Sequence, residues 1–170
     1  MYRKYINREE FSSYEEFKKE YKINIPENFN FAYDIVDGWA EAEPEKKALW
    51  YLDDHGFERE FTFAEISLLS KKAASFLKSL GIKKGDRVMT FLRRRWEYWV
   101  MATALHRIGA ILIPSSVQMT KKDIIYRANS AGVKLIAAAA DEYAISQVEA
   151  ARPECTTVEN YVLAGENREG

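Results

Sequence analysis

Short, continuous apolar segments alternate with segments of helical periodicity along most of this chain, and this alternation limits its fold more than any other feature. Residues 88–92 (VMTFL) form such an apolar run, and a helical pattern follows over residues 96–108. Residues 110–113 then form a second apolar run, which ends at Pro114. Strands that are apolar at every position are typical of parallel sheets whose two faces are both covered. The alternation therefore predicts right-handed strand–helix–strand units in an α/β fold.

The same alternation continues toward the C-terminus. Thr120 and Asp123 have the spacing of a capping box, which predicts a helix that begins after Thr120. We expect a strand over residues 134–138, a shorter helix over residues 143–151 and a last strand near residues 158–163. The parallel sheet should therefore contain at least two further strands.

An antiparallel hairpin is expected before the parallel part. Residues 48–52 and 57–61 both have strand composition, and the polar residues and glycine between them are typical of a turn. Thr62 and Glu65 then form a second capping box, and the helix that they begin should end at Gly81. The fold class is therefore a layered α/β sheet built of βαβ units, with a preceding hairpin.

The N-terminal residues have a different character. Ser12 with Glu15, or Ser13 with Glu16, favours the start of a short helix, and Pro26 interrupts the pattern. A helix is expected to begin near Phe29 and to end before Pro44. We accordingly divide the chain into an N-terminal helical arm, residues 1–28, and an α/β portion, residues 29–170.

Composition excludes several classes of function. The 25 Lys and Arg residues nearly balance the 26 Asp and Glu residues, which argues against a nucleic acid as partner. Cys155 is the only cysteine, so neither an internal disulfide nor a cysteine-based zinc site is expected, and two distant histidines offer no metal site. No apolar stretch is long enough for a membrane span, and the first thirty residues lack a signal-peptide core. We therefore expect a cytoplasmic protein.

A ligand is expected at the carboxyl ends of the parallel strands, as is usual in sheets of this kind. Those ends lie at residues 93–95, 114–119 and 139–142. The eight glycines have the spacing of neither a dinucleotide-binding fingerprint nor a P-loop. The sequence also supports no nucleophilic triad, so no catalytic residue is assigned.

Two of these strand ends contain candidate binding residues. The run Arg93, Arg94 and Arg95 could clamp a phosphate, because guanidinium groups bind phosphate bidentately. The alternative is a solvated loop, and because charge runs are normally surface features, the alternative is favoured. Gln118 lies in a polar loop that could either contact a ligand or precede the cap of the next helix, and position alone favours neither.

Several of these segments together resemble a known family. Residues 61–66 (FTFAEI), 85–88 (GDRV) and 107–110 (RIGA), in this order and spacing, resemble the AMP-forming acyl-CoA synthetases of the adenylate-forming superfamily. Residues 114–120 (PSSVQMT) and 123–127 (DIIYR) are most similar to the medium-chain branch. Each motif is weak by itself, whereas their order is fairly specific.

The resemblance implies a ligase that joins a carboxylic (fatty) acid to CoA in two steps. The carboxylate attacks the α-phosphate of ATP to give acyl-AMP and pyrophosphate, and the thiol of CoA then displaces AMP. ATP, Mg²⁺ and CoA are therefore implied for the full-length parent, and none is expected to bind tightly to this chain. Within the resemblance, Gln118 matches a residue near the CoA channel, whereas the arginine run departs from the family's usual loop before Glu97. Arg94 is the second candidate for cofactor binding because of its guanidinium, not because of the resemblance.

The resemblance also implies that much of the catalytic machinery lies elsewhere. The family's Ser/Thr/Gly-rich phosphate loop, its acidic magnesium and ribose contacts and its C-terminal lysine all lie downstream of the matched region. We therefore expect a truncated chain, the opening part of a larger N-terminal domain, which is inactive by itself. Two alternatives remain: an α/β module that binds CoA or another phosphorylated ligand without catalysis, and an assembly domain. Self-association could use an unpaired sheet edge or the aromatic arm.

Overall fold

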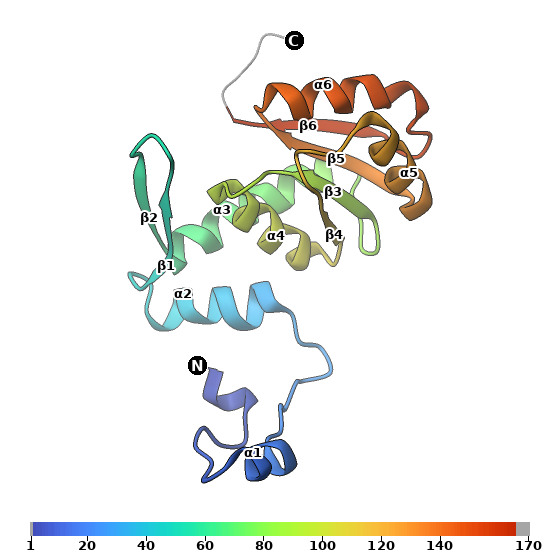
Figure 1. The fold of residues 1–170 in the computed structure, drawn as a ribbon. Coiled ribbons are helices and arrows are strands. Elements are labelled where there is room, and N and C mark those ends of the chain that lie inside the picture. The colour runs from blue at the N-terminus through green and yellow to red at the C-terminus, as the bar shows by residue number, and fades with distance from the viewer. Residues whose placement is uncertain (1, 166–170) are drawn as a thin grey trace.

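Four parallel strands form the centre of the molecule. In the computed structural model, which describes residues 2–165, the strand order is β4-β3-β5-β6 (Figure 1). β3 (Arg87–Phe91) and β5 (Val133–Ala139) are the inner strands, and β4 (Ile111–Pro114) and β6 (Asn160–Ala164) are the outer ones. The predicted parallel α/β sheet is thus confirmed, although the last five residues of the predicted α/β portion lie outside the described residues.

Helices cover both faces of this sheet. α3 (Phe63–Ser79) and α4 (Trp96–Ile108) contribute to the core on one face, where Val88 of β3 lies. α5 (Lys121–Ala131) and α6 (Glu142–Ala151), which is followed by a 3₁₀ turn, η3 (Arg152–Glu154), contribute to the core on the other face with Met89. Because successive strand residues enter opposite cores, the inner strands are apolar at nearly every position.

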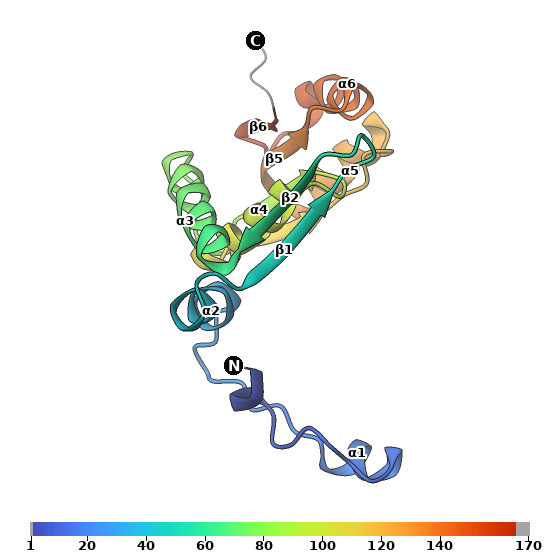
Figure 2. The same ribbon diagram turned by 90° about the vertical axis from the view of Figure 1, so that its left-hand side faces the viewer.

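The predicted hairpin precedes α3. β1 (Lys47–Leu52) pairs antiparallel with β2 (Glu58–Thr62) as a separate two-stranded sheet, and β2 leads directly into α3 (Figure 2). Both predicted capping boxes are present: Thr62 with Glu65 at the start of α3, and Thr120 with Asp123 at the start of α5. These local signals fix where the helices begin.

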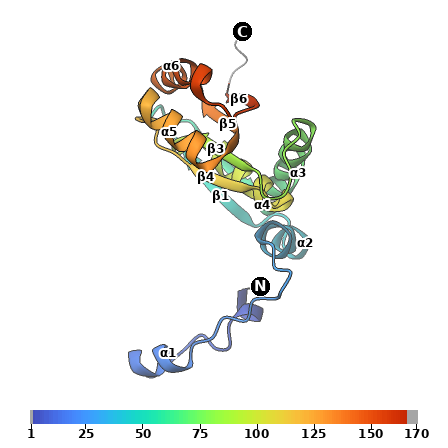
Figure 3. The same ribbon diagram turned by 90° about the vertical axis from the view of Figure 1, so that its right-hand side faces the viewer.

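The segment before the hairpin differs in detail from the prediction. The helix expected near Phe29 begins as a π-helical stretch, η2 (Ala32–Asp37), and continues as α2 (Gly38–Ala42). Before it, η1 (Tyr2–Tyr5) and α1 (Tyr14–Glu20) belong to an arm that projects away from the α/β body (Figure 3). Tyr5 is buried against the edge of the Phe29 ring, with the ring centroids 5.4 Å apart, so this contact helps to attach the arm.

Cations lie at the carboxyl ends of two helices at the amino edge of the sheet. Lys134 Nζ donates to the carbonyl oxygen of Gly81, just after α3, at 3.1 Å. The Arg87 guanidinium lies beside Gly132, the left-handed residue that ends α5. The aliphatic part of the Lys84 side chain lies beside Gly109, the left-handed residue that ends α4. Positive charge beside Gly81 and Gly132 offsets the partial negative charge of the last helical carbonyls.

A buried ion pair joins η2 to α4. Arg107 donates to both carboxylate oxygens of Asp37, at 2.7 and 2.8 Å, and Ser67 Oγ donates to the same carboxylate at 2.7 Å. Arg107 also donates to Ser70 of α3 at 3.0 Å. Burial by itself would raise the pKa of Asp37, but the hydrogen bonds from Arg107 and Ser67 outweigh it and hold this pKa below its ordinary value.

We predict that Asp37→Ala lowers the free energy of unfolding by about 3 kcal/mol, because it leaves the buried Arg107 guanidinium without its counter-charge. The matched control is Lys71→Ala, since Lys71 lies 3.7 Å from the same carboxylate but its side chain is 55% exposed. This control should cost less than about 1 kcal/mol. Urea denaturation measures both values, and equal losses would contradict the prediction.

The same pair predicts a pH dependence. Because the pKa of Asp37 is lower in the folded chain than in the unfolded chain, its stabilisation is complete above the unfolded value, about pH 4. The stabilisation is then lost as pH falls through the lower, folded value. Urea denaturation at a series of pH values between 6 and 2 should therefore show a smaller acid destabilisation in Asp37→Asn than in the parent.

Candidate functional site at the carboxyl edge of the sheet

The carboxyl ends of β3 and β5 form a topological switch point. After β3 the chain enters α4 on one face of the sheet, whereas after β5 it enters α6 on the opposite face. The two strands are neighbours, so the loops that leave them diverge. A crevice between such diverging loops is where open α/β sheets usually bind their ligands. The loops of residues 92–95 and 140–141 are therefore the candidate functional site.

Arg93 and Asp141 connect the two loops. Arg93 Nη1 lies 3.4 Å from Asp141 Oδ2, across the switch point. Asp141 Oδ1 accepts a hydrogen bond from the backbone N–H of Ala144 at 3.0 Å and so also caps α6. Arg93 has a φ of 49° and is the only non-glycine residue with a positive φ in the part of the chain that the structure describes. The conformation is unfavourable for a side chain of this size and gives the loop its sharp turn.

Arg95 and Glu97 form a second ion pair, where the same loop enters α4. Arg95 donates to Glu97 Oε1 from two nitrogens, at 2.6 and 3.2 Å, and this hydrogen bonding raises the pKa of Arg95. The other carboxylate oxygen of Glu97 is buried without a hydrogen-bond partner. Arg95 precedes α4 without capping it through its side chain. Charge is therefore concentrated here, but two of the three arginines are already paired with acids.

Arg94 and Gln118 lie in loops that follow neighbouring strands. Arg94 is exposed and has no hydrogen bond, ion pair or ring contact within residues 2–165. Gln118 is also exposed, and its backbone N–H donates to Ser116 Oγ at 3.2 Å. The structure places both candidates at the carboxyl edge of the sheet, as the strand order requires, but records no contact between them. Arg94 is thus the arginine of the run that is available to a ligand.

Within residues 2–165, no group of three or more His, Cys, Asp or Glu residues is placed to hold a metal ion. The loop of residues 139–142 was predicted as a strand end, but the double role of Asp141 in it was not predicted. An aspartate directly before a helical pattern is itself a capping signal and could have indicated part of that role.

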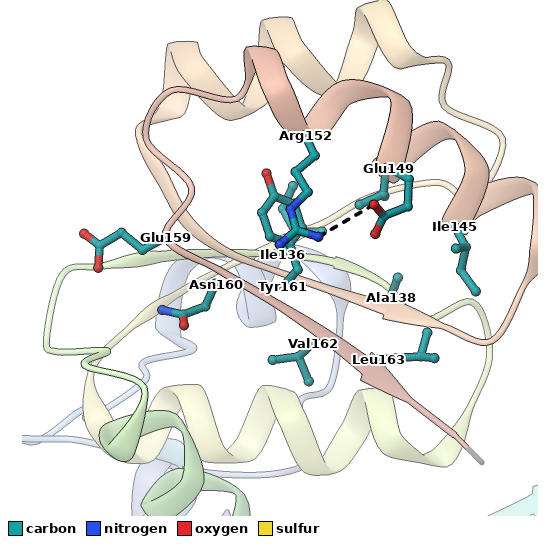
Figure 4. Close-up of a pocket in the computed structure, with 11 residues that line it drawn as sticks. Ile136, Ala138, Ile145, Glu149, Arg152, Glu159, Asn160, Tyr161, Val162 and Leu163 are labelled. Carbon is teal, nitrogen blue, oxygen red and sulfur yellow. Dashed lines mark ion pairs between the residues drawn. The ribbon is translucent and has the colours of Figure 1, made fainter. Parts of the chain in front are cut away.

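A hollow of about 420 Å³ lies apart from the switch point, between α6 and the outer strand β6 (Figure 4). Ile145, Tyr161 and Leu163 supply part of its apolar lining. Arg152 lies over the ring of Tyr161, 4.7 Å from its centroid, and forms an ion pair with Glu149 at 3.7 Å. This hollow lies along the length of β6 rather than at the carboxyl ends of the strands.

Comparison with known proteins identifies relatives for most of the chain. The family model described as AMP-binding enzyme matches residues 36–169. The mouse mitochondrial acyl-coenzyme A synthetase ACSM3 is 38% identical over 167 residues, which cover 94% of this chain and 28% of that protein. The human mitochondrial acyl-coenzyme A synthetase ACSM4 is 37% identical over 145 residues, or 82% of this chain and 25% of that protein. The chain thus spans little more than a quarter of the length of these curated relatives.

Solved structures with the same fold include two acyl-CoA ligases. The anthranilate CoA ligase AuaEII, solved in complex with anthranoyl-AMP, has a TM-score of 0.75 and 23% identity, covering 86% of this chain and 27% of that chain. The N-terminal domain of FACL13 from Mycobacterium tuberculosis has a TM-score of 0.72 and 22% identity, covering 80% and 34%. No helix within residues 2–165 combines the length and apolar character needed to cross a membrane.

We predict that the cap, rather than the ion pair with Arg93, accounts for most of the stabilisation by Asp141. Asp141→Ala should lower the free energy of unfolding by about 1 kcal/mol, because it removes the cap of α6. Asp141→Asn keeps a capping oxygen and should cost less than about 0.5 kcal/mol, since the Arg93 side chain is 62% exposed. If thermal denaturation shows that Asp141→Ala and Asp141→Asn lose the same free energy of unfolding, then the ion pair with Arg93 provides most of the stabilisation by Asp141.

Proposed function

Because this chain belongs to the family of AMP-binding enzymes, we propose that it forms part of the N-terminal domain of an AMP-forming acyl-CoA synthetase. The observation that carries the proposal is the match of residues 36–169 to the family model, together with the acyl-CoA synthetase relatives at 36–38% identity. The proposed division of the chain is an arm, residues 1–28, and an α/β portion from residue 29 onward.

The proposed reaction of the parent enzyme has two balanced steps. A carboxylate oxygen bonds to the α-phosphorus of ATP while the bond to pyrophosphate breaks. The CoA thiol sulfur then bonds to the acyl carbon while the bond from that carbon to AMP breaks, and the thiol proton is released to water. Both steps depend mainly on positioning and on neutralisation of phosphate charge, for which Mg²⁺ would supply positive charge when bound. Within residues 2–165, no group of three or more His, Cys, Asp or Glu residues could hold that ion. We therefore propose no binding residue for ATP or Mg²⁺ among the residues described above.

The chain of 170 residues is proposed to lack catalytic activity by itself. Its matched segment corresponds to 28% of the mouse relative, and the switch-point loops offer paired arginines rather than an arranged nucleophile or acid. The proposal covers these residues alone and not any longer protein of which they are part.

We expect no carboxylate-dependent exchange of pyrophosphate into ATP when the 170-residue chain is tested with a series of fatty acids. A cooperative thermal transition in circular dichroism serves as the control that the chain is folded in the assay. A full-length member of the same family is the positive control. Robust exchange by the folded chain would contradict the proposed inactivity.

Arg94 and Gln118 are proposed to contribute to a binding surface for CoA. Their support is their position on loops at the carboxyl edge of the sheet, and the free guanidinium of Arg94 suits a phosphate. The competing proposal is that the α/β body is a binding module that holds CoA, or another phosphorylated ligand, without catalysis. The two proposals share this surface and differ in whether the natural protein catalyses the reaction.

We expect calorimetry to detect weak CoA binding, with a dissociation constant near the millimolar range, about 4 kcal/mol of binding free energy. Arg94→Ala should weaken binding at least about fivefold, because the loss of one charged hydrogen bond to phosphate is worth about 1 kcal/mol or more. Lys122→Ala, which removes an exposed cation of α5, is the matched control and should leave binding unchanged. Equal effects of both variants would indicate a merely electrostatic attraction.

Two further proposals concern location and assembly. We propose a cytoplasmic location, which fractionation of cells that express the natural protein can test, although the mammalian relatives carry the word mitochondrial in their names. We also propose that copies of the chain associate, either through the arm or through an open edge of the sheet. An assembly role is an alternative to the enzymatic proposal.

A further inference from the structure

A strongly basic segment runs along α3 and through the loop that follows it. Residues 66–85 contain five lysines and no aspartate or glutamate, although the whole chain has a net charge of −1. The five lysines, all of them exposed, are Lys71, Lys72, Lys78, Lys83 and Lys84. Within residues 2–165, only the first of them forms an ion pair, with the Asp37 carboxylate at 3.7 Å. Most of the positive charge of this segment is therefore unpaired in the described part of the chain.

The helical repeat places these cations on the side of α3 that faces away from the sheet. The inner side of α3 is buried and includes Ile66, Ala74 and Leu77. At about 100° per residue, Lys72 and Lys78 project from the other side of the helix. In Figures 2 and 3, α3 lies on the outside of the α/β body, on the side opposite α5. The basic side of α3 is thus part of the outer surface of this body.

Two large apolar side chains are exposed on the same side of α3. Leu68 is 54% exposed and Phe76 is 48% exposed, and Lys72 lies midway between them in the sequence. Four residues are about one turn of helix, so all three side chains project in similar directions. Single exposed apolar residues are ordinary, but a helix face that combines leucine and phenylalanine with lysines is typical of contact with a membrane surface. The ammonium groups then stay at the level of the headgroups, while the aliphatic stems and the ring enter the lipid boundary.

The residue types on this side of α3 favour a lipid surface over a protein or a nucleic acid as the partner. Interfaces between proteins are depleted of lysine and enriched in arginine, and α3 contains three lysines and no arginine. Arginine suits the bidentate recognition of one phosphate, whereas separate lysines act as point charges and suit many phosphates spread over a plane. The nearly balanced charge of the whole chain argues against a nucleic acid.

We propose that the outer side of α3 binds the surface of a membrane that contains anionic phospholipids. Lys72, Lys78 and Lys83 supply the attraction to the headgroup phosphates, and Leu68 and Phe76 supply the apolar contact. α3 lies on this surface rather than across it, because its inner side belongs to the core beneath the sheet. The association is electrostatic in the main, so it is reversible and weakens as salt screens the charges.

Sedimentation of the chain with lipid vesicles tests this proposal. The chain should sediment with vesicles of phosphatidylcholine and phosphatidylserine in equal parts, and at least about tenfold more weakly with vesicles of phosphatidylcholine alone. Salt at about 1 M, where the Debye length is about 3 Å, should remove most of the binding. Equal binding to the two kinds of vesicle would overturn the proposal.

A triple substitution locates the binding surface. Replacing Lys72, Lys78 and Lys83 together by glutamine should weaken vesicle binding about a hundredfold, because each lysine near an anionic surface is worth about fivefold in affinity. The matched control replaces three exposed lysines of the arm and of α5 by glutamine and changes the net charge equally: Lys18, Lys19 and Lys122. This control should weaken binding less than about threefold. Thermal denaturation checks that both variants remain folded, and equal losses of binding would overturn the proposal.

The apolar contact has its own readout. Phe76→Ser should weaken vesicle binding about fivefold at each salt concentration at which binding is measured, because salt does not screen an apolar contact. Tyr126→Ser is the matched control, since Tyr126 is a 71% exposed aromatic residue of α5, and it should leave vesicle binding unchanged. Equal effects of the two substitutions would contradict a contact between Phe76 and the lipid.

Two soluble competitors distinguish the lipid surface from other anionic partners. Glycerol phosphate at millimolar concentration should not displace the vesicles, because one headgroup meets only one lysine, and displacement would instead identify a discrete phosphate site. A chain that binds polyglutamate but not anionic vesicles would overturn the proposal in favour of an acidic protein. The inference does not depend on the catalytic proposal, since no readout involves ATP or CoA.

Discussion

The position of β3 between β4 and β5 is the constraint on which the rest of the structure depends. Because crossovers between parallel strands are right-handed, a chain that continues first to one side of β3 and then to the other must place its helices on opposite faces. Both faces of β3 are therefore covered, which explains why Val88 and Met89, though neighbours in sequence, belong to different cores. The same constraint makes the loops after β3 and β5 diverge.

Strand direction also gives the two edges of the sheet opposite electrostatic character. All of the crossover helices point their amino ends toward the carboxyl edge and their carboxyl ends toward the amino edge. Arg87 and Lys134 offset negative helix ends at the amino edge. At the carboxyl edge, Asp123 and Asp141 supply negative charge at the starts of α5 and α6. Arg94 adds positive charge where the family resemblance expects a phosphorylated cofactor.

Local signals made most of the fold predictable, and long-range contacts account for the rest. The end of α4 follows from the left-handed glycine at position 109, and both capping boxes lie where the spacing indicates. The π-helical start of η2 has no such local signal. Asp37 and Arg107 are seventy residues apart in sequence, so a pattern of neighbours could not reveal their ion pair. The positive φ of Arg93 could not be predicted, because an arginine, unlike a glycine, gives no sequence signal for a left-handed conformation.

The contrast between Arg107 and Arg94 argues for a division of roles among the arginines. Arg107 is 8% exposed and held by a carboxylate and a serine, so its geometry is fixed before any ligand arrives. Arg94 is free in solvent, and ordering its side chain on a phosphate costs up to about 2 kcal/mol of conformational entropy. That cost offsets part of the gain from the charged hydrogen bonds that the guanidinium makes to phosphate. Tight binding of a phosphorylated cofactor at this edge therefore requires further contacts, which residues outside the switch-point loops would have to supply.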